Sequence, residues 1–169
     1  MEIILETPRL ILRKKVVEDA PFFMELNSNP MVTKYTGDGA FKNREEAENI
    51  VRYVIGQYEK NGYGRWLVAD KETNEPLGWC GLKYHEDNGE TDLGYRFMEK
   101  HWGKGYATES AMACLQYGFE HFNLKRIVGR AAVKNTASIK VLKKVGMTFF
   151  ENTFLDTMPS YIYHIIKEI

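Results

Sequence analysis

One strand-helix-strand unit in the middle of the chain constrains the fold more than any other feature. Residues 90–99, "ETDLGYRFME", alternate apolar and polar side chains, which is the pattern of a strand with one buried face. Residues 104–122 repeat apolar or small side chains every three or four positions, as a helix lying close to a sheet does. Residues 126–133, "RIVGRAAV", are again typical of a strand. Because a helical crossover joins parallel strands, these segments predict an α/β fold with a mixed sheet.

The other segments add strands and helices to this unit. The full order is strand, helices, three strands, helix, strand, helix and two strands, which predicts a three-layer α/β sandwich with a mixed central sheet of about six to seven strands flanked by helices. No linker or repeat divides the chain, so we expect one domain over residues 1–169. We expect strands around Leu10 and Leu12 and at 63–70, 76–85, 147–155 and 159–169, helices from Ala20 and at 43–62 and 135–146, and a loop at 29–41.

The balance of charge gives no general attraction to nucleic acid or to an anionic membrane. The 23 basic and 23 acidic residues cancel to a net charge of +0, which leaves only a local basic patch open. No apolar run approaches the roughly 18 residues that span a bilayer, and the chain opens on no hydrophobic signal segment. We therefore expect a cytoplasmic protein with no membrane or nucleic-acid partner.

The cysteines and histidines predict a reduced protein without a metal. Cys80 and Cys114 lie in apolar surroundings with no C-x-x-C spacing, which favours two buried thiols over the alternative, a disulfide. None of the four histidines is paired with another at H-x-x-x-H spacing. We expect no metal site.

A glycine-rich turn, "HWGKGYATES" at 101–110, lies where the strand should give way to the helix. Such a turn leaves several main-chain amides free near the positive end of the helix dipole, and this arrangement binds anions. Gly103 and Gly105 would let a phosphate approach the backbone, while Lys104 and Thr108 add a charge and a hydroxyl. The alternative is a sharp turn whose glycines serve backbone geometry alone. The spacing matches neither the nucleotide triphosphatase loop nor the dinucleotide-binding loop.

Two longer stretches carry a resemblance to a known family. "DLGYRFMEKHWGKGYATES" at 92–110 and "LKRIVGRAAVKNTASIKVLKKVGM" at 124–147, with "TPRLILR" at 7–13, resemble the GNAT superfamily of N-acetyltransferases. Within it they are most similar to the branch of ribosomal-protein N-terminal acetyltransferases (RimJ/RimL-like). The family's phosphate loop, Q/R-x-x-G-x-G/A, is matched by "WGKGYA", in which Trp102 takes the first position.

The resemblance implies acetyl-coenzyme A as cosubstrate and assigns residues to it. The strand that ends at Phe97 would hydrogen-bond the pantetheine arm, and the Phe97 amide would donate to the thioester carbonyl. Asn135, in the family's N-x-x-[AS] pattern, would contact the same arm. The pyrophosphate would be held by the amides of Gly103, Lys104, Gly105, Tyr106 and Ala107, with Thr108.

Transfer of an acetyl group to an amine also requires an unprotonated amine. An α-amine, with a pKa of about 8, needs a weaker base than a lysine at about 10.4. Asp92 is a candidate base acting through water, and its alternative role is a solvated strand carboxylate or a partner of Arg96. Glu109 is a second candidate, and its alternative role is to orient a loop or stabilise the first helical turn.

The departing thiolate also requires a proton donor. Many family members carry a tyrosine seven residues after the asparagine, whereas this chain has Leu142 there. Ser138 matches a serine proposed for this role in the ribosomal-protein branch. Its alternative role is that of a first-turn residue which satisfies backbone groups.

The acceptor is an amine whose identity the sequence leaves open. We expect a protein N-terminal α-amine, with an aminoglycoside, a polyamine or an amino-acid analogue as the alternative, bound by a monomer or a homodimer. A module that senses acyl-coenzyme A without turnover is a further alternative, whereas a nucleic-acid-binding domain lacks both a helix-turn-helix and a basic charge. Four aromatic residues either line the acceptor pocket or belong to the core: Trp66, Trp79, Tyr35 and Tyr84. Three lysines either face solvent or form a basic rim near the coenzyme: Lys140, Lys143 and Lys144.

Overall fold

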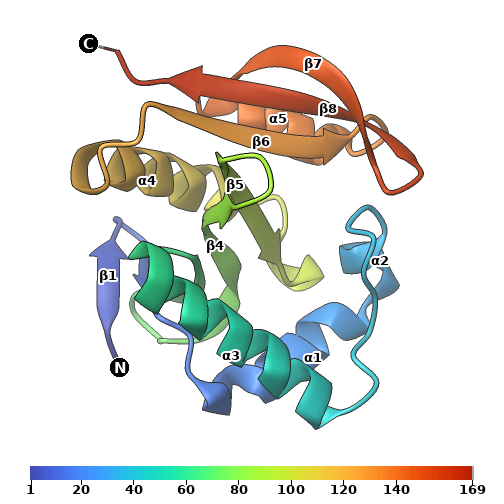
Figure 1. The fold of residues 1–169 in the computed structure, drawn as a ribbon. Helices are drawn as coiled ribbons and strands as arrows, with labels where there is room; N and C mark the ends of the chain where they lie inside the picture. Colours follow the sequence, from blue (N-terminus) through green and yellow to red (C-terminus); the bar gives the residue numbers. More distant parts are fainter. Residues whose placement is uncertain (169) are drawn as a thin grey trace.

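The strands of the protein form one mixed sheet. A computed structural model describes residues 1–168, which contain one eight-stranded sheet in the order β1-β2-β3-β4-β5-β6-β8-β7 (Figure 1). The expected count of six to seven strands is one short, because Thr7 turns the N-terminal segment back on itself: its hydroxyl accepts from the Leu10 amide at 3.0 Å, so two strands replace one. The strands are β1 (Ile3–Glu6), β2 (Leu10–Arg13), β3 (Arg65–Asp70), β4 (Pro76–His85), β5 (Glu90–Phe97), β6 (Arg126–Ala132), β7 (Thr148–Leu155) and β8 (Met158–Ile166).

The helices follow the four expected segments, with three short additions, Val17–Asp19, Pro30–Thr33 and Glu99–His101. Part of the expected loop is a short helix, because the side chain of Asn29 accepts from the Met31 amide at 2.9 Å and Pro30 favours the first helical position. Within residues 1–168, no helix is both long and apolar enough to cross a bilayer. The helices are η1 (Val17–Asp19), α1 (Ala20–Ser28), α2 (Pro30–Thr33), α3 (Arg44–Asn61), η2 (Glu99–His101), α4 (Tyr106–His121) and α5 (Thr136–Lys144).

Helix ends are set by the capping residues that the sequence contains. The Asn43 side chain accepts from the Glu46 amide at 2.9 Å and begins α3, and Gly62 ends it with a φ of +81°. Asn135 caps α5 in the same way, accepting from the Ser138 amide at 3.2 Å. These local interactions explain why the sequence located both helices closely.

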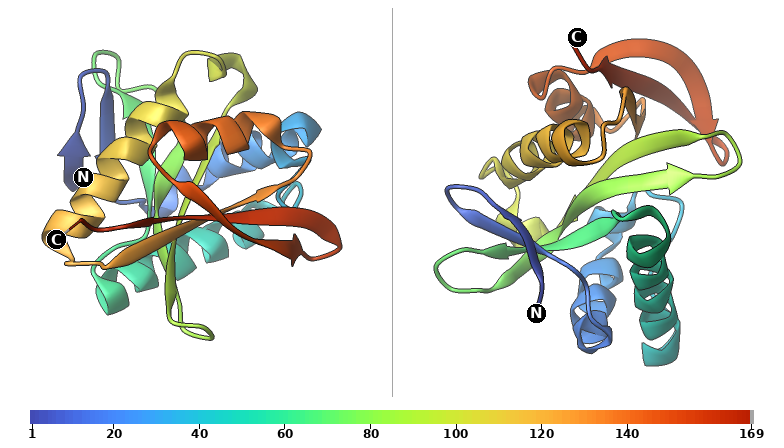
Figure 2. Two further views of the ribbon diagram at one scale, coloured as in Figure 1. Left: turned by 90° about the horizontal axis from the view of Figure 1, so that it is seen from above. Right: turned by 60° about the vertical axis from the view of Figure 1, so that its left-hand side comes forward.

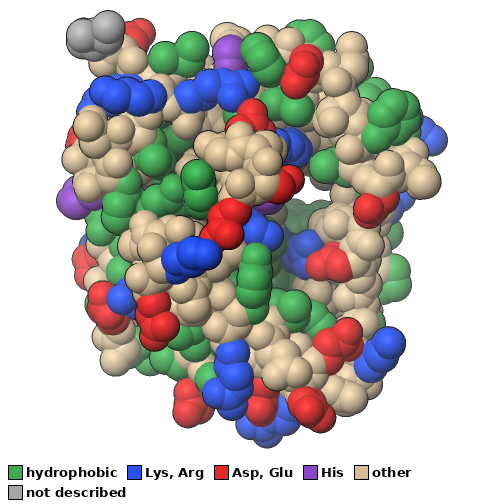
Figure 3. All heavy atoms as spheres, in the orientation of Figure 1, with side chains coloured by type: hydrophobic (Ala, Val, Ile, Leu, Met, Phe, Trp, Pro, Cys, Tyr) green, Lys and Arg blue, Asp and Glu red, His purple; other side chains and the backbone are tan. Residues whose placement is uncertain are grey.

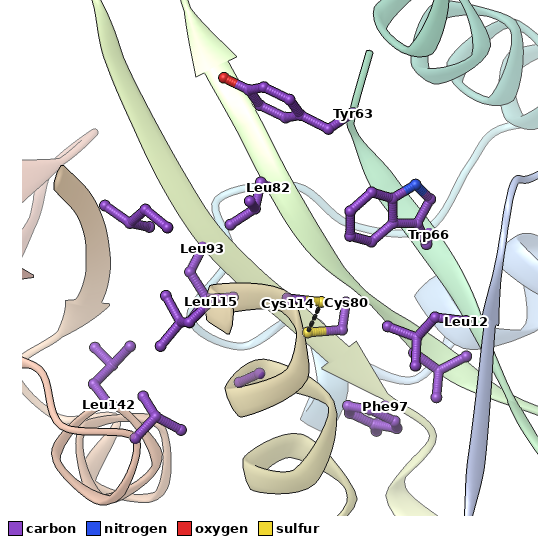
Figure 4. Close-up of a cluster of buried hydrophobic side chains, with 14 of the residues drawn as sticks. Leu12, Tyr63, Trp66, Cys80, Leu82, Leu93, Phe97, Cys114, Leu115 and Leu142 are labelled. Carbon is purple, nitrogen blue, oxygen red and sulfur yellow. Dashed lines mark hydrogen bonds between the residues drawn. The ribbon is translucent and has the colours of Figure 1, made fainter. Parts of the chain in front are cut away.

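Helices cover both faces of the sheet, so the fold has three layers (Figures 1 and 2). Helices α1 and α3 pack together on one face, where Phe23, Leu26 and Val51 meet Leu67 of β3. Helix α4 lies on the other face with α5 beside it. Figure 4 shows Leu115 and Cys114 of α4 over Cys80, Leu82 and Leu93 of the central strands and beside Trp66 of β3.

The two cysteines meet inside this second core layer (Figure 4). Cys80 and Cys114 are fully buried and free, with their sulfur atoms 3.7 Å apart. The prediction of two buried thiols is confirmed, and the alternative of a disulfide is wrong.

Strands β5 and β6 are parallel, as the crossover predicts, but they pair only briefly. The ladder joins Asp92 to Val128 and Leu93 to Gly129 and then stops, although β5 runs on to Phe97 and β6 to Ala132. The two strands therefore diverge towards their carboxyl ends. This divergence exposes an edge of β5 in the middle of the sheet, next to the start of α4.

Candidate active site

The turn between β5 and α4 is built on two glycines in the left-handed region. Gly103 has a φ of +75° and Gly105, the N-cap of α4, has a φ of +80°. L side chains rarely adopt such angles, so the turn requires glycine at both positions whatever it binds. No atom lies within 4 Å of the position that a Cβ on Gly103 would take. By helix geometry the first amides of α4 lack internal acceptors, and those of Tyr106, Ala107 and Thr108 are free to bind an anion.

Trp102 connects the end of β5 to this turn. Its indole N–H donates to the Phe97 carbonyl at 2.9 Å, while 46% of its surface stays exposed. A tryptophan at the first position of the loop motif thus fixes the path of the chain between β5 and the glycines.

Arg9, which the sequence did not single out, clamps the turn from the N-terminal side. Its guanidinium donates to the Lys104 carbonyl at 2.9 Å and to the Glu109 carboxylate at 2.7 Å. The same group lies 4.7 Å above the centre of the Tyr106 ring. No local signal could reveal this clamp, because Arg9 and Glu109 are 100 positions apart in the chain.

Glu109 is the anchor of this clamp. One of its oxygens accepts from the Thr7 hydroxyl at 2.7 Å and from the Arg9 amide at 3.0 Å. Burial would raise the pKa of Glu109, but these hydrogen bonds outweigh burial and lower it. Glu109 therefore ties the β1–β2 turn to the first turn of α4, in line with the loop-orienting alternative.

The free edge of β5 faces the gap left by β6. The Met98 amide donates to the carbonyl of Leu77, near the start of β4, at 3.0 Å. Because amide directions alternate along a strand, the Phe97 amide points to the opposite side, where β6 has diverged. The short helix η2 connects this end of β5 to the glycine turn.

Ser138 and Tyr95 meet across the opening between β5 and α5. Their hydroxyl oxygens are 2.9 Å apart, and the Tyr95 hydroxyl also donates to the Ser138 carbonyl at 3.0 Å. Burial raises the pKa of Tyr95 above its ordinary value, so this phenol keeps its proton. The Tyr95 hydroxyl thus contacts both the hydroxyl and the carbonyl of Ser138 and fixes the position of this residue.

Asp92 is the centre of a buried ion cluster. Its carboxylate lies 2.5 Å from Arg65, 3.1 Å from His85 and 3.3 Å from Arg130. The Arg65 guanidinium reaches it across Gly94, where a Cβ would come within 2.7 Å of that guanidinium. Burial alone would raise the pKa of Asp92, but the cations around it, Arg65 first, hold that pKa well below its ordinary value.

The alternative role for Asp92, a solvated carboxylate or a partner of Arg96, is wrong. Asp92 is 9% exposed, and Arg96 bonds instead to Asp38 at 3.0 Å. The reason is strand geometry: positions four apart on a strand are separated by about 13 Å, too far for an ion pair. Arg65, on a neighbouring strand, is closer.

A hollow borders this region on the side of α1 and α2. Figure 3 shows it between the central strands and the segment that carries α2, with basic and acidic side chains at its rim. A cavity of about 550 Å³ also opens beside the end of β5, lined by Asn29, Val32, Met98, Glu99 and Lys100. Both lie on the sheet face opposite α4, where an acceptor has room to approach β5.

Comparison with known proteins decides the family. The family model described as an acetyltransferase (GNAT) domain matches residues 9–148. The chain belongs to the GNAT acetyltransferase family. It is 35% identical to the uncharacterized N-acetyltransferase p20 of Bacillus licheniformis over 84% of this chain and 80% of that protein.

Solved structures agree with this placement of the GNAT protein. A GNAT-family acetyltransferase from Bacillus anthracis covers 98% of both chains at 29% identity with a TM-score of 0.81. RimL, a ribosomal L7/L12 α-N-protein acetyltransferase solved with coenzyme A, covers 98% of both chains at 21% identity and a TM-score of 0.81, which shows the fold alone. This GNAT protein is an N-acetyltransferase that uses acetyl-coenzyme A.

The site of this acetyltransferase fits acetyl-coenzyme A. The space that a side chain on Gly103 would fill is empty, so a phosphate can approach the backbone there. The free amides at the start of α4 can bind the pyrophosphate. The exposed edge of β5 can pair with an extended amide-bearing arm as a neighbouring strand would. Within residues 1–168, no three His, Cys, Asp or Glu side chains gather to hold a metal ion.

The remaining candidate residues of the acetyltransferase divide between core and surface. Trp66 is 1% exposed and packs edge-on to Tyr117 of α4, so it belongs to the core. Leu142, at the position of the family tyrosine, is also buried and packs beneath Gly129. Trp79 faces α1 and α3 instead, Tyr84 packs at the margin of the main core, and Tyr35 is half-buried. Lys140, Lys143 and Lys144 are exposed on α5.

The Arg9 clamp makes a testable contribution to coenzyme binding. We expect Arg9→Met to weaken coenzyme A binding by about tenfold, because the charge-assisted bonds that hold the Lys104 carbonyl and α4 in place are lost. Arg52→Met is the matched control, since Arg52 makes an exposed ion pair with Glu48 on α3 and no contact with the turn. Calorimetric titration with coenzyme A measures both, and equal affinities for the two variants would contradict the clamp.

Proposed function

We propose that this enzyme transfers acetyl from acetyl-coenzyme A directly to the α-amine of its acceptor, with no acetylated enzyme intermediate. One observation carries the proposal: beyond Leu93 the edge of β5 is not paired with β6, and one turn of η2 connects the end of that strand to the glycine turn and the free amides of α4. A single extended ligand with an amide arm and a pyrophosphate matches that line. The amine nitrogen bonds to the acetyl carbon, the carbon–sulfur bond breaks, and protons pass from the amine to a base and to the thiolate from an acid.

We assign one group of residues to each part of the bound coenzyme, in order from β5 to α4. The Phe97 amide donates to the thioester carbonyl. Asn135 uses its side-chain oxygen on the Ser138 amide, which leaves its NH2 group for the arm. The pyrophosphate is held by the amides of Gly103, Lys104, Gly105, Tyr106 and Ala107 and by Thr108.

The environment of the carboxylates favours an α-amine over a lysine or polyamine nitrogen. Asp92 and Glu109 both have lowered pKa values and are bound to arginines, so each is a weak base. An α-amine with a pKa of about 8 gives up its proton near neutral pH far more readily than an amine near 10.4, so a site without a strong base favours the α-amine. We assign Asp92 and Glu109 to positioning, with a water molecule carrying the amine proton away.

Ser138 is our proposed acid, positioned by Tyr95. We expect Ser138→Ala to lower kcat by about a hundredfold, because the thiolate then leaves without a donated proton. Tyr95→Phe should cost less and mainly move the pH profile, since it removes only the contact that orients Ser138. Steady-state rates across pH measure both.

Thr136→Ala is the control for Ser138, because Thr136 is an exposed residue in the first turn of the same helix. A Ser138→Ala variant within about threefold of the wild-type kcat would remove Ser138 as the acid.

We place the enzyme in the RimJ/RimL-like branch, with a protein N-terminal amine as acceptor, on the resemblance of its loop and of the Asn135 region. The experiment that tests the function measures thiol release from acetyl-coenzyme A with peptides, polyamines, aminoglycosides and amino acids. Release with an α-amine supports the proposal. Tight coenzyme binding without release for any amine would instead identify a sensing module.

A further inference from the structure

Three cations surround one indole ring on the acceptor side of the sheet. The charged groups of Lys15, Arg65 and Arg96 lie 5.4, 5.3 and 5.4 Å from the centre of the Trp79 ring. Trp79 pairs with Arg96 in the register of β4 and β5 and belongs to the layer of α1 and α3. Since Arg96 belongs to the cluster and precedes Phe97, the cluster lies next to the end of β5.

Two of these cations have counter-ions and the third has none. Arg65 pairs with Asp92, and Arg96 bonds to Asp38 and, at 2.8 Å, to the side-chain oxygen of Asn27. Lys15 is 6% exposed, and its ammonium makes no hydrogen bond or ion pair with any of residues 1–168.

The surroundings of Lys15 are apolar and basic. Its ammonium lies 4.3 Å from the centre of the Phe23 ring, and the nearby carboxylate of Asp19 is taken by Arg13 at 2.7 Å. The Arg96 Nε is also buried without a partner in the described part of the chain. Buried polar groups are normally paired, so the Arg96 Nε points to an absent partner, and the Lys15 ammonium adds a charge without a counter-ion 5.4 Å from the centre of the same indole ring.

We propose that Lys15 and Arg96, whose charged groups both lie 5.4 Å from the centre of the Trp79 ring, bind a carboxylate of the acceptor, which is therefore an α-amine with a carboxylate a few bonds away. This inference rests on the proposed function, because Arg96 precedes the amide assigned to the thioester carbonyl. The Arg96 guanidinium already donates to the carboxylate of Asp38, whose side chain is half exposed, so a carboxylate is a group that Arg96 binds.

Electrostatics around Lys15 support an anionic acceptor. Burial, then repulsion from Arg65 and Arg96, lowers the pKa of Lys15 to about 7, against a weaker opposing effect of Asp19. A bound carboxylate offsets this repulsion. A polyamine or an aminoglycoside would add positive charge to a site that already has an excess of it.

The test compares acceptors that differ in one charge. Tripeptides beginning Ser-Asp, Ser-Asn and Ser-Lys are assayed with a free α-amino acid, its amide and spermidine, and kcat/KM is measured by thiol release. We expect an anionic acceptor to exceed its neutral match by at least about tenfold, in the peptide pair or in the amino-acid pair. The peptide pair reports a carboxylate on the second residue, and the amino-acid pair reports the α-carboxylate.

Lys15→Met should remove that preference while coenzyme A affinity stays at the wild-type value. Lys14→Met is the matched control, because its neighbouring ammonium pairs with Glu2 at the surface. The comparison of acceptors on the wild-type enzyme uses no variant, so it tests the inference even if Lys15→Met does not fold.

The outcomes separate this inference from the proposed function. Turnover of neutral or polycationic amines as well as of anionic ones, or an acid preference that survives in Lys15→Met, would overturn the anionic subsite alone. Failure to bind coenzyme A, or binding without turnover of any amine, would overturn the proposed function and the subsite with it.

Discussion

Gly105→Val is expected to abolish detectable binding of coenzyme A. The residue has a φ of +80°, which a β-branched side chain adopts only with strain, and its Cβ would lie 3.4 Å from the Arg9 guanidinium. Relief of that strain must turn the amides at the start of α4 away from their common target. Since several charge-assisted hydrogen bonds are lost together, we expect the dissociation constant to rise by at least about a hundredfold.

Calorimetric titration and thermal unfolding together measure this effect. Gly56→Val is the control: Gly56 is exposed on α3, and no atom lies within 4 Å of its added Cβ. Gly105→Val should fold and fail to bind coenzyme A, whereas Gly56→Val should bind it normally. Wild-type affinity in a folded Gly105→Val protein would place the pyrophosphate away from this turn.

Asp92→Asn is expected to destabilise the protein by about 3 to 5 kcal/mol. Asp92 compensates Arg65 and Arg130 in a buried cluster, and removal of one partner leaves charges inside the protein without a counter-ion. Urea denaturation measures the difference. Asp87→Asn, an exposed change in the turn between β4 and β5, is the control and should have little effect.

The pH dependence of this difference follows from the lowered pKa of Asp92. A folded-state pKa below that of the unfolded chain gives stability that is complete above about pH 4 and is lost as the pH falls further. The gap between wild type and Asp92→Asn should therefore close with acid. A gap that stays constant down to pH 2, which is about two units below the ordinary value, would contradict the ion cluster as its cause.

Kinetics of Asp92→Asn separate positioning from base catalysis. A base that takes the amine proton contributes about a hundredfold or more to kcat. We expect a smaller loss in kcat, with the acidic limb of the pH profile unchanged, because Asp92 holds Arg65 and not the amine proton. A loss of kcat above a hundredfold in a folded variant would restore Asp92 as the base.

Features that depend on neighbouring residues were predictable from the sequence. The β5–α4–β6 crossover follows from the periodicity of residues 90–133, and the turn at Gly103 and Gly105 follows from the two glycines at the start of the helix. Asn135 as the cap of α5 follows from its side-chain chemistry. Where local signals were missed, they were short: a four-residue helix after Asn29 and a turn at Thr7 that divides one strand into two.

The partners of the charged residues were decided only by the tertiary structure. Arg9 reaches Glu109, Arg65 reaches Asp92, and Lys15 comes to lie over Trp79 without a counter-ion, all across separations of 27 residues or more. Periodicity tells which face of a strand a side chain occupies, and it carries no information on which distant strand or helix will face it. Sequence thus determined the strands, the crossover and the glycine turn, because backbone angles and caps are local. The packing of the layers determined which charged residues meet in the Arg9 clamp, in the Asp92 ion cluster and around Trp79, because charges pair through space and not along the chain.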